Sequence, residues 1–510
     1  MRTWKTVIVL LMVFAAWSWS EAQEPSKEGL RIEPSPQGGG LLHLSLQESI
    51  QLALKHNLDI AIEGFNPRIR DEEVIVERAV FDPSAFAEGD VANSATPNRS
   101  RLAAVSVSRD LTANFNLGFR QKLPTGGSYE FRFNNNRDDS NAGFLQPPDG
   151  INPAYASDVT LTLTQPLLKD FGIDINLTRV RIARNNRGIS QEDLRARANG
   201  VITDVEGAYW DLVAAIQNLE VQRRSLQLAK ELMELNKARV RAGVAAPVEV
   251  TQAEAEAAAR EKDVIQAEKG VKDAEDRLKL ILNIPDDRIW GLDILPSDMP
   301  PFKVELVDLP RSLEEALSKR PEVQKTKIDI QNKDLNLRLA RNQLLPRLDL
   351  QGSVGVNGLN GAYSGNLDRL FTGDFNSFSI GVVLEVPIGN RAARANFMKA
   401  KLETDQAMTA LRNIERTIVT EVREAVRRVE AATKVVNATR EARRLAEEQL
   451  RVEQKRLEAG VTTTFNVLRF QRDLTSAQAD EVRAIAEYNK ALANLEKVKG
   501  TVLEKHRLEL

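Results

Sequence analysis

The side chains that could carry out chemistry in this sequence do not form a catalytic or metal-binding pattern. The histidines are His43, His56 and His506, and none belongs to a pair with metal-ligand spacing such as H-E-x-x-H. Cysteine is absent, which excludes disulfides and thiolate metal sites. The glycines spaced by three between 352 and 361 lie in a predicted strand and its loop, with no helix directly after them to receive a phosphate. We therefore predict no catalytic residue, no metal site, no cofactor and no enzymatic activity.

The charges of the sequence are balanced and dispersed. Lys and Arg number 70 against 72 Asp and Glu, which gives a formal net charge of -2 over 510 residues. The carboxylates fall among lysines and arginines, as expected for the solvated faces of helices. This balance gives no electrostatic reason to expect nucleic acid or an anionic membrane surface as a partner.

Two short turns organise the chain, at residues 242–250 and 459–467. Each contains Ala-Gly-Val, and Gly243 and Gly460 lie 217 positions apart. Each glycine follows a long helical pattern, at the position where a helix can end in left-handed geometry. Pro247 follows in the first turn, ahead of a returning helical pattern. Each turn is therefore predicted to be the tip of an αα-hairpin.

The returning arms after the two turns share one register. Apolar or small residues recur at steps of three and four from Val250 to Ile281, and a shift of 217 maps them onto a similar series from Val467 to Val498. The charged exceptions are Arg260 in the first arm and Glu481 in the second. A repeat of 3.5 residues predicts coiled-coil packing, and the shared register indicates an internal duplication.

Strand patterns precede each long helix, in regions at about 84–166 and 347–387. Apolar residues alternate with polar or small ones, for example at Leu161 and Leu163 in the first region and at Ile380 and Val382 in the second. A repeat of two residues predicts strands with one apolar face and one face exposed to water. The first region is 42 residues longer, and the additional residues contain a predicted hairpin at 111–136. A soluble antiparallel sheet with one wet face would show the same alternation.

The N-terminus has the form of a secretory signal peptide. Arg2 and Lys5 flank an apolar run from 6 to 17, and Ser20-Glu21-Ala22 offers small residues for cleavage. No later stretch approaches the roughly 20 apolar residues of a transmembrane helix, so any membrane crossing is predicted to use strands.

The whole sequence divides into five predicted regions. A single helix is expected from about 46 to 80, and its pattern recurs from 309 at a shift of 263. The regions are a signal peptide (1–22), a flexible lead (23–42), a first helix-strand-helix repeat (43–283), a Pro-rich equatorial connector (284–311) and a second repeat (312–510).

The number of strands has a consequence for assembly. About four strands, or six if the inserted hairpin joins them, are too few to close a transmembrane barrel, because barrels start at about eight strands. If these strands cross a membrane, several chains must contribute to one barrel.

These features in this order resemble the TolC family of outer membrane efflux proteins over nearly the whole mature chain. The resemblance rests on the signal peptide, the duplicated order of helices and strands, the proline in Gln165-Pro166-Leu167 and the Ala-Gly-Val turns. It implies an α+β membrane protein, in which coiled-coil hairpins form a periplasmic tunnel and a homotrimer shares one β-barrel of twelve strands in the outer membrane lipid. The 42 additional residues depart from this pattern and leave open whether the hairpin is an outer loop or adds strands.

The resemblance also implies a function. It implies a channel of a Gram-negative envelope that exports small molecules or proteins together with a periplasmic adaptor and an inner-membrane pump. Two alternatives remain. A periplasmic coiled-coil adaptor typically has a single hairpin, and a structural coiled-coil protein of the envelope would share the heptads but not the strands.

A candidate gate follows from the resemblance, at the start of each returning helix. Members of the family have acidic residues at these positions, and Glu249 matches one of them. The second turn departs from this pattern. Asn466 occupies a position where Asp is common, and Arg469 occupies a position where another acidic residue would be expected. We expect a mixed constriction in which Glu249 and Arg469 of adjacent hairpins pair. Alternatively, these are ordinary solvated residues, since the helix dipole alone favours Glu249 in a first turn.

Overall fold

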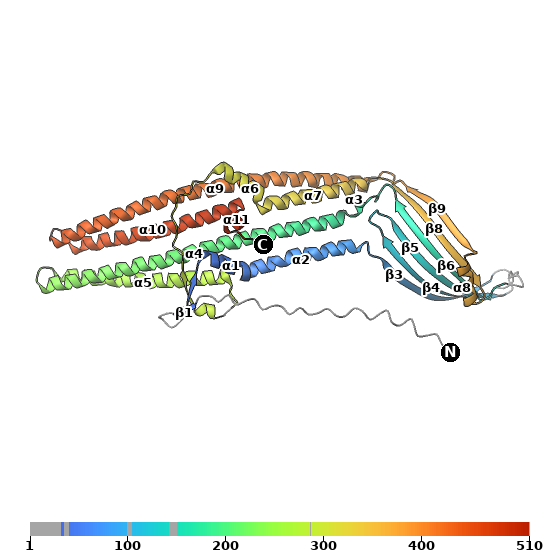
Figure 1. Cartoon of the computed structure of the whole chain (residues 1–510), viewed down its shortest axis with the longest axis horizontal. Coiled ribbons are helices and arrows are strands. Elements are labelled where there is room, and N and C mark those ends of the chain that lie inside the picture. The colour runs from blue at the N-terminus through green and yellow to red at the C-terminus, as the bar shows by residue number, and fades with distance from the viewer. Residues whose placement is uncertain (1–31, 35–39, 99–104, 142–149, 286, 509–510) are drawn as a thin grey trace.

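The protein is an elongated bundle of helices with a sheet at one end (Figure 1). The computed structural model describes residues 32–34, 40–98, 105–141, 150–285 and 287–508. Helices α4 (Thr178–Arg241) and α9 (Arg391–Glu458) contain 64 and 68 residues. At 1.5 Å per residue each is about 100 Å long, and both run from the sheet to the hairpin tips at the opposite end.

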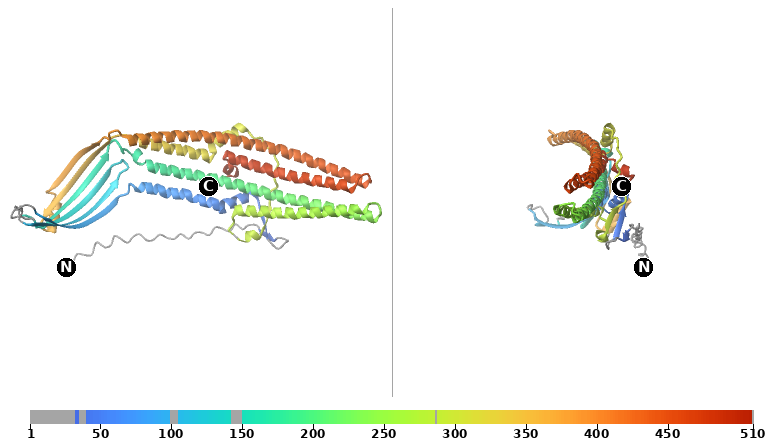
Figure 2. Two further views of the ribbon diagram at one scale, coloured as in Figure 1. Left: turned by 180° about the vertical axis from the view of Figure 1, so that it is seen from behind. Right: turned by 90° about the vertical axis from the view of Figure 1, so that its left-hand side faces the viewer.

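The helices form four parallel columns. Helices α2 (Leu58–Ala79) and α5 (Pro247–Leu282) lie end to end beside α4. Helices α7 (Pro321–Asn342) and α10 (Thr464–Lys499) lie end to end between α4 and α9. Figure 2 shows the same arrangement from behind. The order across the molecule is therefore α2/α5, α4, α7/α10 and α9.

The helix predicted from 46 to 80 is interrupted, which corrects that expectation. Helix α1 (Leu46–His56) ends at Asn57, whose extended backbone separates it from α2. The Asn57 side chain accepts hydrogen bonds from the amides of Asp59 and Ile60 and donates one to the Ile281 carbonyl (2.9 Å). Helix α6 (Leu309–Lys319) is separated from α7 in the same way by Arg320, which is 263 positions after Asn57.

The predicted flexible lead (23–42) is wrong for its last residues. Strands β1 (Ile32–Pro34) and β2 (Gly40–Leu44) pair with each other, and β2 pairs in parallel with β7 (Asp293–Pro296) of the connector. Leu42 and Leu44 are buried, so burial of alternate apolar side chains holds this segment in place. The predicted signal peptide (1–22) lies outside the described residues.

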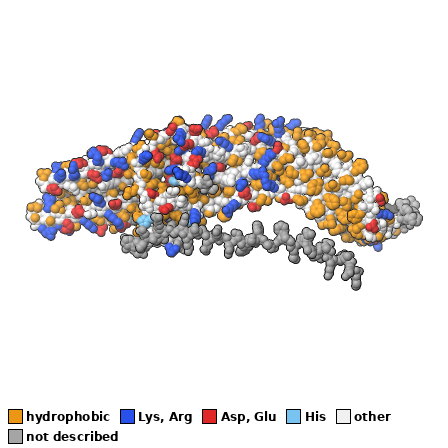
Figure 3. Space-filling model, in the orientation of Figure 1, with side chains coloured by type: hydrophobic (Ala, Val, Ile, Leu, Met, Phe, Trp, Pro, Cys, Tyr) orange, Lys and Arg blue, Asp and Glu red, His pale blue; other side chains and the backbone are white. Residues whose placement is uncertain are grey.

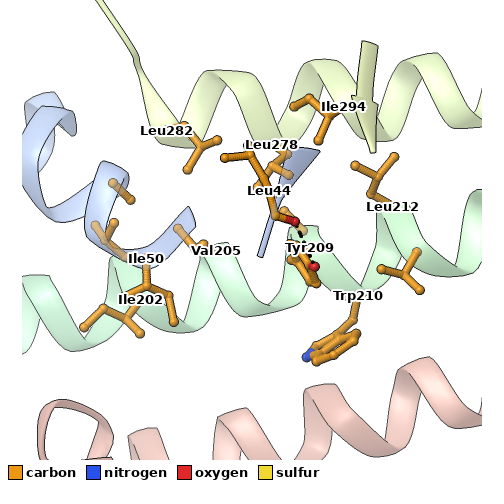
Figure 4. Packing of buried hydrophobic residues seen from close by; sticks show 14 of the residues in the cluster. Leu44, Ile50, Ile202, Val205, Tyr209, Trp210, Leu212, Leu278, Leu282 and Ile294 are labelled. Carbon is orange, nitrogen blue, oxygen red and sulfur yellow. Dashed lines mark hydrogen bonds between the residues drawn. The ribbon is translucent and has the colours of Figure 1, made fainter. Parts of the chain in front are cut away.

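A core at the middle of the long axis joins the lead, the connector and the first repeat (Figure 4). Tyr209 and Trp210 of α4 pack edge to face, with ring centroids 5.2 Å apart. Apolar side chains from α1, α5 and β7 surround Tyr209, among them Ile50, Leu278 and Ile294. The short 3-10 helix Asp287–Gly291 and helix α11 (Val502–His506) lie at the same level.

Six strands form one antiparallel sheet in the order β3-β4-β5-β6-β8-β9. The strands are β3 (Ser84–Pro97), β4 (Val107–Lys122), β5 (Ser128–Ser140), β6 (Ala154–Pro166), β8 (Arg347–Asn360) and β9 (Asn376–Glu385). Helix α3 (Ile173–Asn176) follows β6, and helix α8 (Tyr363–Thr372) lies between β8 and β9. The predicted hairpin at 111–136 is the pair β4 and β5, so the sheet has six strands where the resemblance implied four per chain.

The surface changes character between the sheet and the helices. Hydrophobic side chains gather over the sheet, whereas charged side chains cover the helical body (Figure 3). On β9, Phe378, Ile380 and Val382 are 84%, 77% and 62% exposed. An exposed apolar surface of this extent indicates a site of contact with lipid or protein.

None of the helices within the described ranges is both long enough and apolar enough to cross a membrane.

Candidate functional site

The two hairpin tips end their long helices with the same backbone geometry. Gly243 has φ 75° and Gly460 has φ 70°, both in the left-handed region that favours glycine. The Gly243 amide donates to the Val240 carbonyl and the Val244 amide donates to the Arg239 carbonyl. The equivalent bonds at the second tip run from Gly460 to Leu457 and from Val461 to Arg456. Both tips are therefore Schellman motifs, and each returning helix starts within a few residues, at Pro247 and Thr464.

Side chains join the two tips to each other. The hydroxyl of Thr464, at the start of α10, donates to Oε2 of Glu249 at the start of α5 (2.7 Å). The same hydroxyl lies 3.2 Å from Oδ1 of Asn236 in α4. Asn236 in turn donates through Nδ2 to the carbonyl oxygen of Glu249 (3.3 Å). Asn236 and Thr464 are fully buried, whereas Glu249 is partly exposed, so the Thr464 hydroxyl proton is shared between a buried amide oxygen and a carboxylate at the edge of the cluster.

The second tip has a separate polar cluster of its own. The buried Glu453 of α9 accepts a hydrogen bond from the Thr462 hydroxyl and pairs with Arg456 (3.0 Å). Asn466 of α10 donates through Nδ2 to the Thr462 hydroxyl oxygen (3.0 Å).

An amide and a carboxylate have exchanged places between the two tips. A shift of 217 maps Asn236 onto Glu453 and Glu249 onto Asn466. Each tip therefore has one amide and one carboxylate. In the first tip the amide is on the outgoing helix α4 and the carboxylate on the returning helix α5, whereas in the second tip the carboxylate is on α9 and the amide on α10. Asn236, Glu453 and Thr464 were not among the residues selected from the sequence. The shift of 217, already visible there, leads to Asn236 and Glu453, whereas nothing in the sequence shows that Thr464 contacts the other hairpin.

The predicted pair of Glu249 and Arg469 is not formed within one chain. Among the described residues no ion pair joins them; Glu249 is bound by Thr464, and Arg469 is exposed. Further charges lie close to the first tip, where Lys237 contacts Glu234 (3.1 Å) and Glu254 (3.5 Å). The hydrogen bond to Glu234 is the main cause of the raised pKa of Lys237.

A pocket of about 560 Å³ lies between the two hairpins next to the tips. Leu232 and Leu235 of α4 line one side, and Leu457 of α9 and Val467 of α10 line the other. Arg239 is the cationic side chain among its lining residues. The two hairpins are therefore in contact at their ends but leave a partly apolar recess behind that contact.

The histidine that lies closest to a buried charge is far from the tips. His506 Nε2 is 2.9 Å from Oε1 of Glu206, and Lys505 Nζ is 3.4 Å from the same oxygen. Burial alone would raise the pKa of Glu206, but the hydrogen bond with His506 and the charge of Lys505 outweigh it and lower that pKa. This cluster fastens α11 to α4. Within the described ranges no group of three or more His, Asp or Glu side chains is placed to hold a metal ion.

Comparison with known proteins identifies the family. The model of the family described as "outer membrane efflux protein" matches residues 49–283 and 312–501. The two matched segments lie on either side of the connector and contain both hairpins and the six-stranded sheet. This match confirms the resemblance drawn from the sequence.

Individual proteins agree with this assignment. Nodulation protein T of Rhizobium leguminosarum bv. trifolii is 23% identical over 338 residues, which is 64% of this chain and 68% of the relative. The probable efflux pump outer membrane protein TtgC of Pseudomonas putida is 21% identical over 438 residues, or 85% of this chain and 78% of the relative. The fold is similar to that of the Campylobacter jejuni CmeC outer membrane channel, with a TM-score of 0.64 at 17% identity over 91% of this chain and 90% of that one.

The family consists of transport channels and is not a family of enzymes. The chain belongs to the outer membrane efflux protein family, and it is an efflux channel of the outer membrane that extends into the periplasm.

Proposed function

We propose that three copies of the chain form one channel. The sheets together make a transmembrane barrel in the outer membrane lipid, and the paired helices make a coiled-coil tunnel across the periplasm. Two features of the sheet support this assembly: its apolar face is exposed, and among the described residues each of the strands β3 and β9 pairs on one side only. In this arrangement residues 284–311 form a belt around the middle of the tunnel, and the mature chain starts after residue 22.

The tips are the end that meets the other components of the efflux system. TtgC is named as the outer membrane protein of an efflux pump, and by analogy this chain works with an inner-membrane pump and a periplasmic adaptor. The recess between the hairpins, with its apolar walls and Arg239, offers a surface on which the adaptor docks. Cargo then enters the tunnel at the tips and leaves through the barrel.

One observation carries the proposal for gating, the hydrogen bond from Thr464 to Glu249. It joins the first hairpin to the second at the narrow end of the molecule. A hydrogen bond to a charged group contributes about 1.5 to 3 kcal/mol, enough to change the ratio of open to closed tips by about 10- to 150-fold. In the closed channel Thr464 holds Glu249, and Glu249, Asn466 and the exposed Arg469 of the three chains line a mixed constriction. Opening requires the two hairpins of each chain to separate.

Single-channel recordings in planar bilayers test this gate. Thr464→Val removes the hydroxyl at nearly constant volume, so we expect more frequent opening and a higher mean conductance than in the wild type. Arg469→Ala removes the cationic side chain from the constriction and is expected to shift ion preference toward cations. Lys269→Ala, at an exposed position of α5 away from the tips, is the matched control and should behave as the wild type. If both Thr464→Val and Arg469→Ala showed the opening frequency, conductance and ion preference of the wild type, the gate would lie elsewhere.

A further inference from the structure

The inserted hairpin lies inside the sheet and not at its edge. Strand β4 pairs with β3 from Ser84 opposite Arg120 to Pro97 opposite Val107. Strand β5 pairs with β6 from Ser128 opposite Thr164 to Asp138 opposite Ala154. β4 and β5 therefore separate β3, which continues from α2, from β6, which leads into α4.

The turn between β4 and β5 is fixed to the helical body. Gln121 Nε2 donates to the Phe81 carbonyl (2.7 Å) at the end of the first helical column. The Gly172 amide, just before α3, donates to the Thr125 carbonyl (3.0 Å). Gly126 has φ 96°, and a Cβ placed there would lie 2.1 Å from the Asp170 carbonyl oxygen. The hairpin is therefore part of the junction between sheet and helices and is not a detachable loop.

Rows of residues across the sheet alternate in character over all six strands. One row is apolar throughout: Ala85, Phe119, Phe131, Leu161, Val354 and Phe378. The neighbouring row is polar throughout: Ser84, Arg120, Glu130, Thr162, Ser353 and Ser379. β4 and β5 thus continue the apolar face that the other strands present, as the wall of a membrane barrel requires.

From this placement we infer that the channel has a barrel of eighteen strands, six from each of three chains. The inference rests on the proposed trimer. β3 starts where α2 ends and β9 ends where α9 begins, so the two edge strands run in opposite directions. β9 of one chain and β3 of the next can therefore pair antiparallel, and three repeats of this pairing close the ring without an unpaired edge.

The width of the sheet matches the width of the helical body. Neighbouring helix axes lie about 8 to 10 Å apart, so four columns cover an arc of about 32 to 40 Å. Strands about 4.8 Å apart and tilted by about 40° each take about 6.3 Å of circumference. Six strands then cover about 38 Å, whereas four cover about 25 Å. Six strands in each chain therefore cover about the same arc as its four helical columns, so the tunnel continues into the barrel at constant width.

This width determines what the barrel can release. Eighteen strands give a backbone radius of about 18 Å, against about 12 Å for twelve. The inward rows consist largely of Thr, Ser, Asn and Gly, with charges that include Arg120 and Glu130. The outer opening is thus a broad polar pore that passes bulky solutes, and the tips alone set the size limit.

Engineered disulfides test the strand order in the full-length chain, which has no cysteine of its own. Ala87→Cys in β3 is combined in turn with cysteine at Phe378, Ile380 or Val382 in β9. We expect one combination to join neighbouring chains into covalent trimers upon oxidation. Ala85→Cys with Leu161→Cys is the control, because these residues share a row but lie three strands apart, too far for a disulfide. A disulfide within one chain at the control pair would overturn the inference, because β3 would then lie beside β6.

Electron microscopy of the purified protein provides the second measurement. We expect a backbone diameter of about 36 Å for the barrel, against about 24 Å for a barrel of twelve strands. A conducting trimer with the narrow barrel in the full-length protein would overturn the inference and leave the proposed function intact. A protein that neither forms trimers nor conducts would overturn the proposed function, and the inference with it.

Discussion

Carboxylates held by hydrogen bonds carry much of the specificity of this chain at the scale of single residues, and two of them, Glu453 and Glu206, are buried. Glu249, Glu453 and Glu206 each accept hydrogen bonds from side chains that are distant in sequence or across a turn. A carboxylate that is wholly or partly withdrawn from water is costly unless it is paired, so each of these contacts favours one arrangement of the helices over its neighbours. At the tips this applies to the separation of the two hairpins, and at Glu206 it applies to the docking of α11.

Glu206 gives a prediction about pH. Its folded-state pKa lies below the ordinary value of 4.5, so the ionised group contributes stability above that value, and the contribution is lost as pH falls through the lowered pKa. We expect this contribution to change little between pH 7 and pH 5, and the thermal midpoint, followed by far-UV circular dichroism, to fall as the pH is lowered below about 4.5.

Glu206→Gln should lower the midpoint at pH 7, consistent with a loss of about 1 to 3 kcal/mol for a buried charged hydrogen bond, and should flatten its dependence on pH. Glu448→Gln removes a carboxylate from an exposed pair with Arg451 and is the matched control, with little expected effect. If the thermal midpoint depended on pH equally in the wild type and in Glu206→Gln, Glu206 would make no such contribution to stability.

At the scale of elements, two tyrosines hold the connector against the helices. The Tyr209 hydroxyl lies 3.2 Å from the Leu44 carbonyl, 3.1 Å from Asp298 Oδ2 and 3.2 Å from the Asp298 amide. Burial raises the pKa of Tyr209, so its hydroxyl stays protonated and can donate. Five residues after Asp298 in the connector, the Lys303 carbonyl accepts a hydrogen bond from the Tyr488 hydroxyl (2.6 Å). The first and second repeats thus each bind one part of the same segment.

The two tyrosines serve as controls for each other. Tyr209→Phe should increase hydrogen exchange of the amides around Asp298, because the Asp298 amide and carboxylate lose a shared partner at a cost of about 1 to 3 kcal/mol. Tyr488→Phe should increase exchange around Lys303 and Glu305 and leave Asp298 unchanged. If both variants loosened the whole connector to the same extent, the segment would be held as one unit and not at two points.

Sequence patterns predicted the larger elements because long helices and strands repeat their apolar residues with a fixed period. The α+β character and the family were predicted in this way and are confirmed. The break at Asn57 was missed because it depends on a contact with Ile281, 224 residues away. Strands β1 and β2 were missed because glycines and prolines indicate flexibility until a partner such as β7 is known.

The location of the inserted hairpin could not be derived either. Alternation shows that β4 and β5 are strands, but their neighbours depend on long-range pairing. At the tips the sequence drew attention to Glu249, Asn466 and Arg469 and not to Thr464, whose contact crosses from one hairpin to the other. The division into five regions, the trimer, the shared barrel and the gate stay predictions.

At the scale of the whole molecule, the exposed apolar face of the sheet predicts how the protein behaves on extraction. The face is continuous across six strands and burying it in lipid is favourable by about 25 cal/mol per Å². We expect the protein to stay in the membrane fraction after high salt, to dissolve in detergent, and to have the mass of three chains by light scattering corrected for bound detergent. Release by salt alone would point to a peripheral protein, and a detergent-soluble monomer would contradict the trimer.

The position of β4 and β5 also limits how this architecture can vary. A hairpin leaves and re-enters the sheet at the same end of its strands, so its insertion changes neither the direction of β6 nor the end of the sheet at which α4 begins. One additional strand would instead send every later helix to the wrong side. The number of strands per chain must therefore be even, and in a threefold assembly the strand total changes only in increments of six. If three chains share one barrel as proposed, pore size is a stepwise property, inherited by gain or loss of whole hairpins and not adjusted by point substitutions.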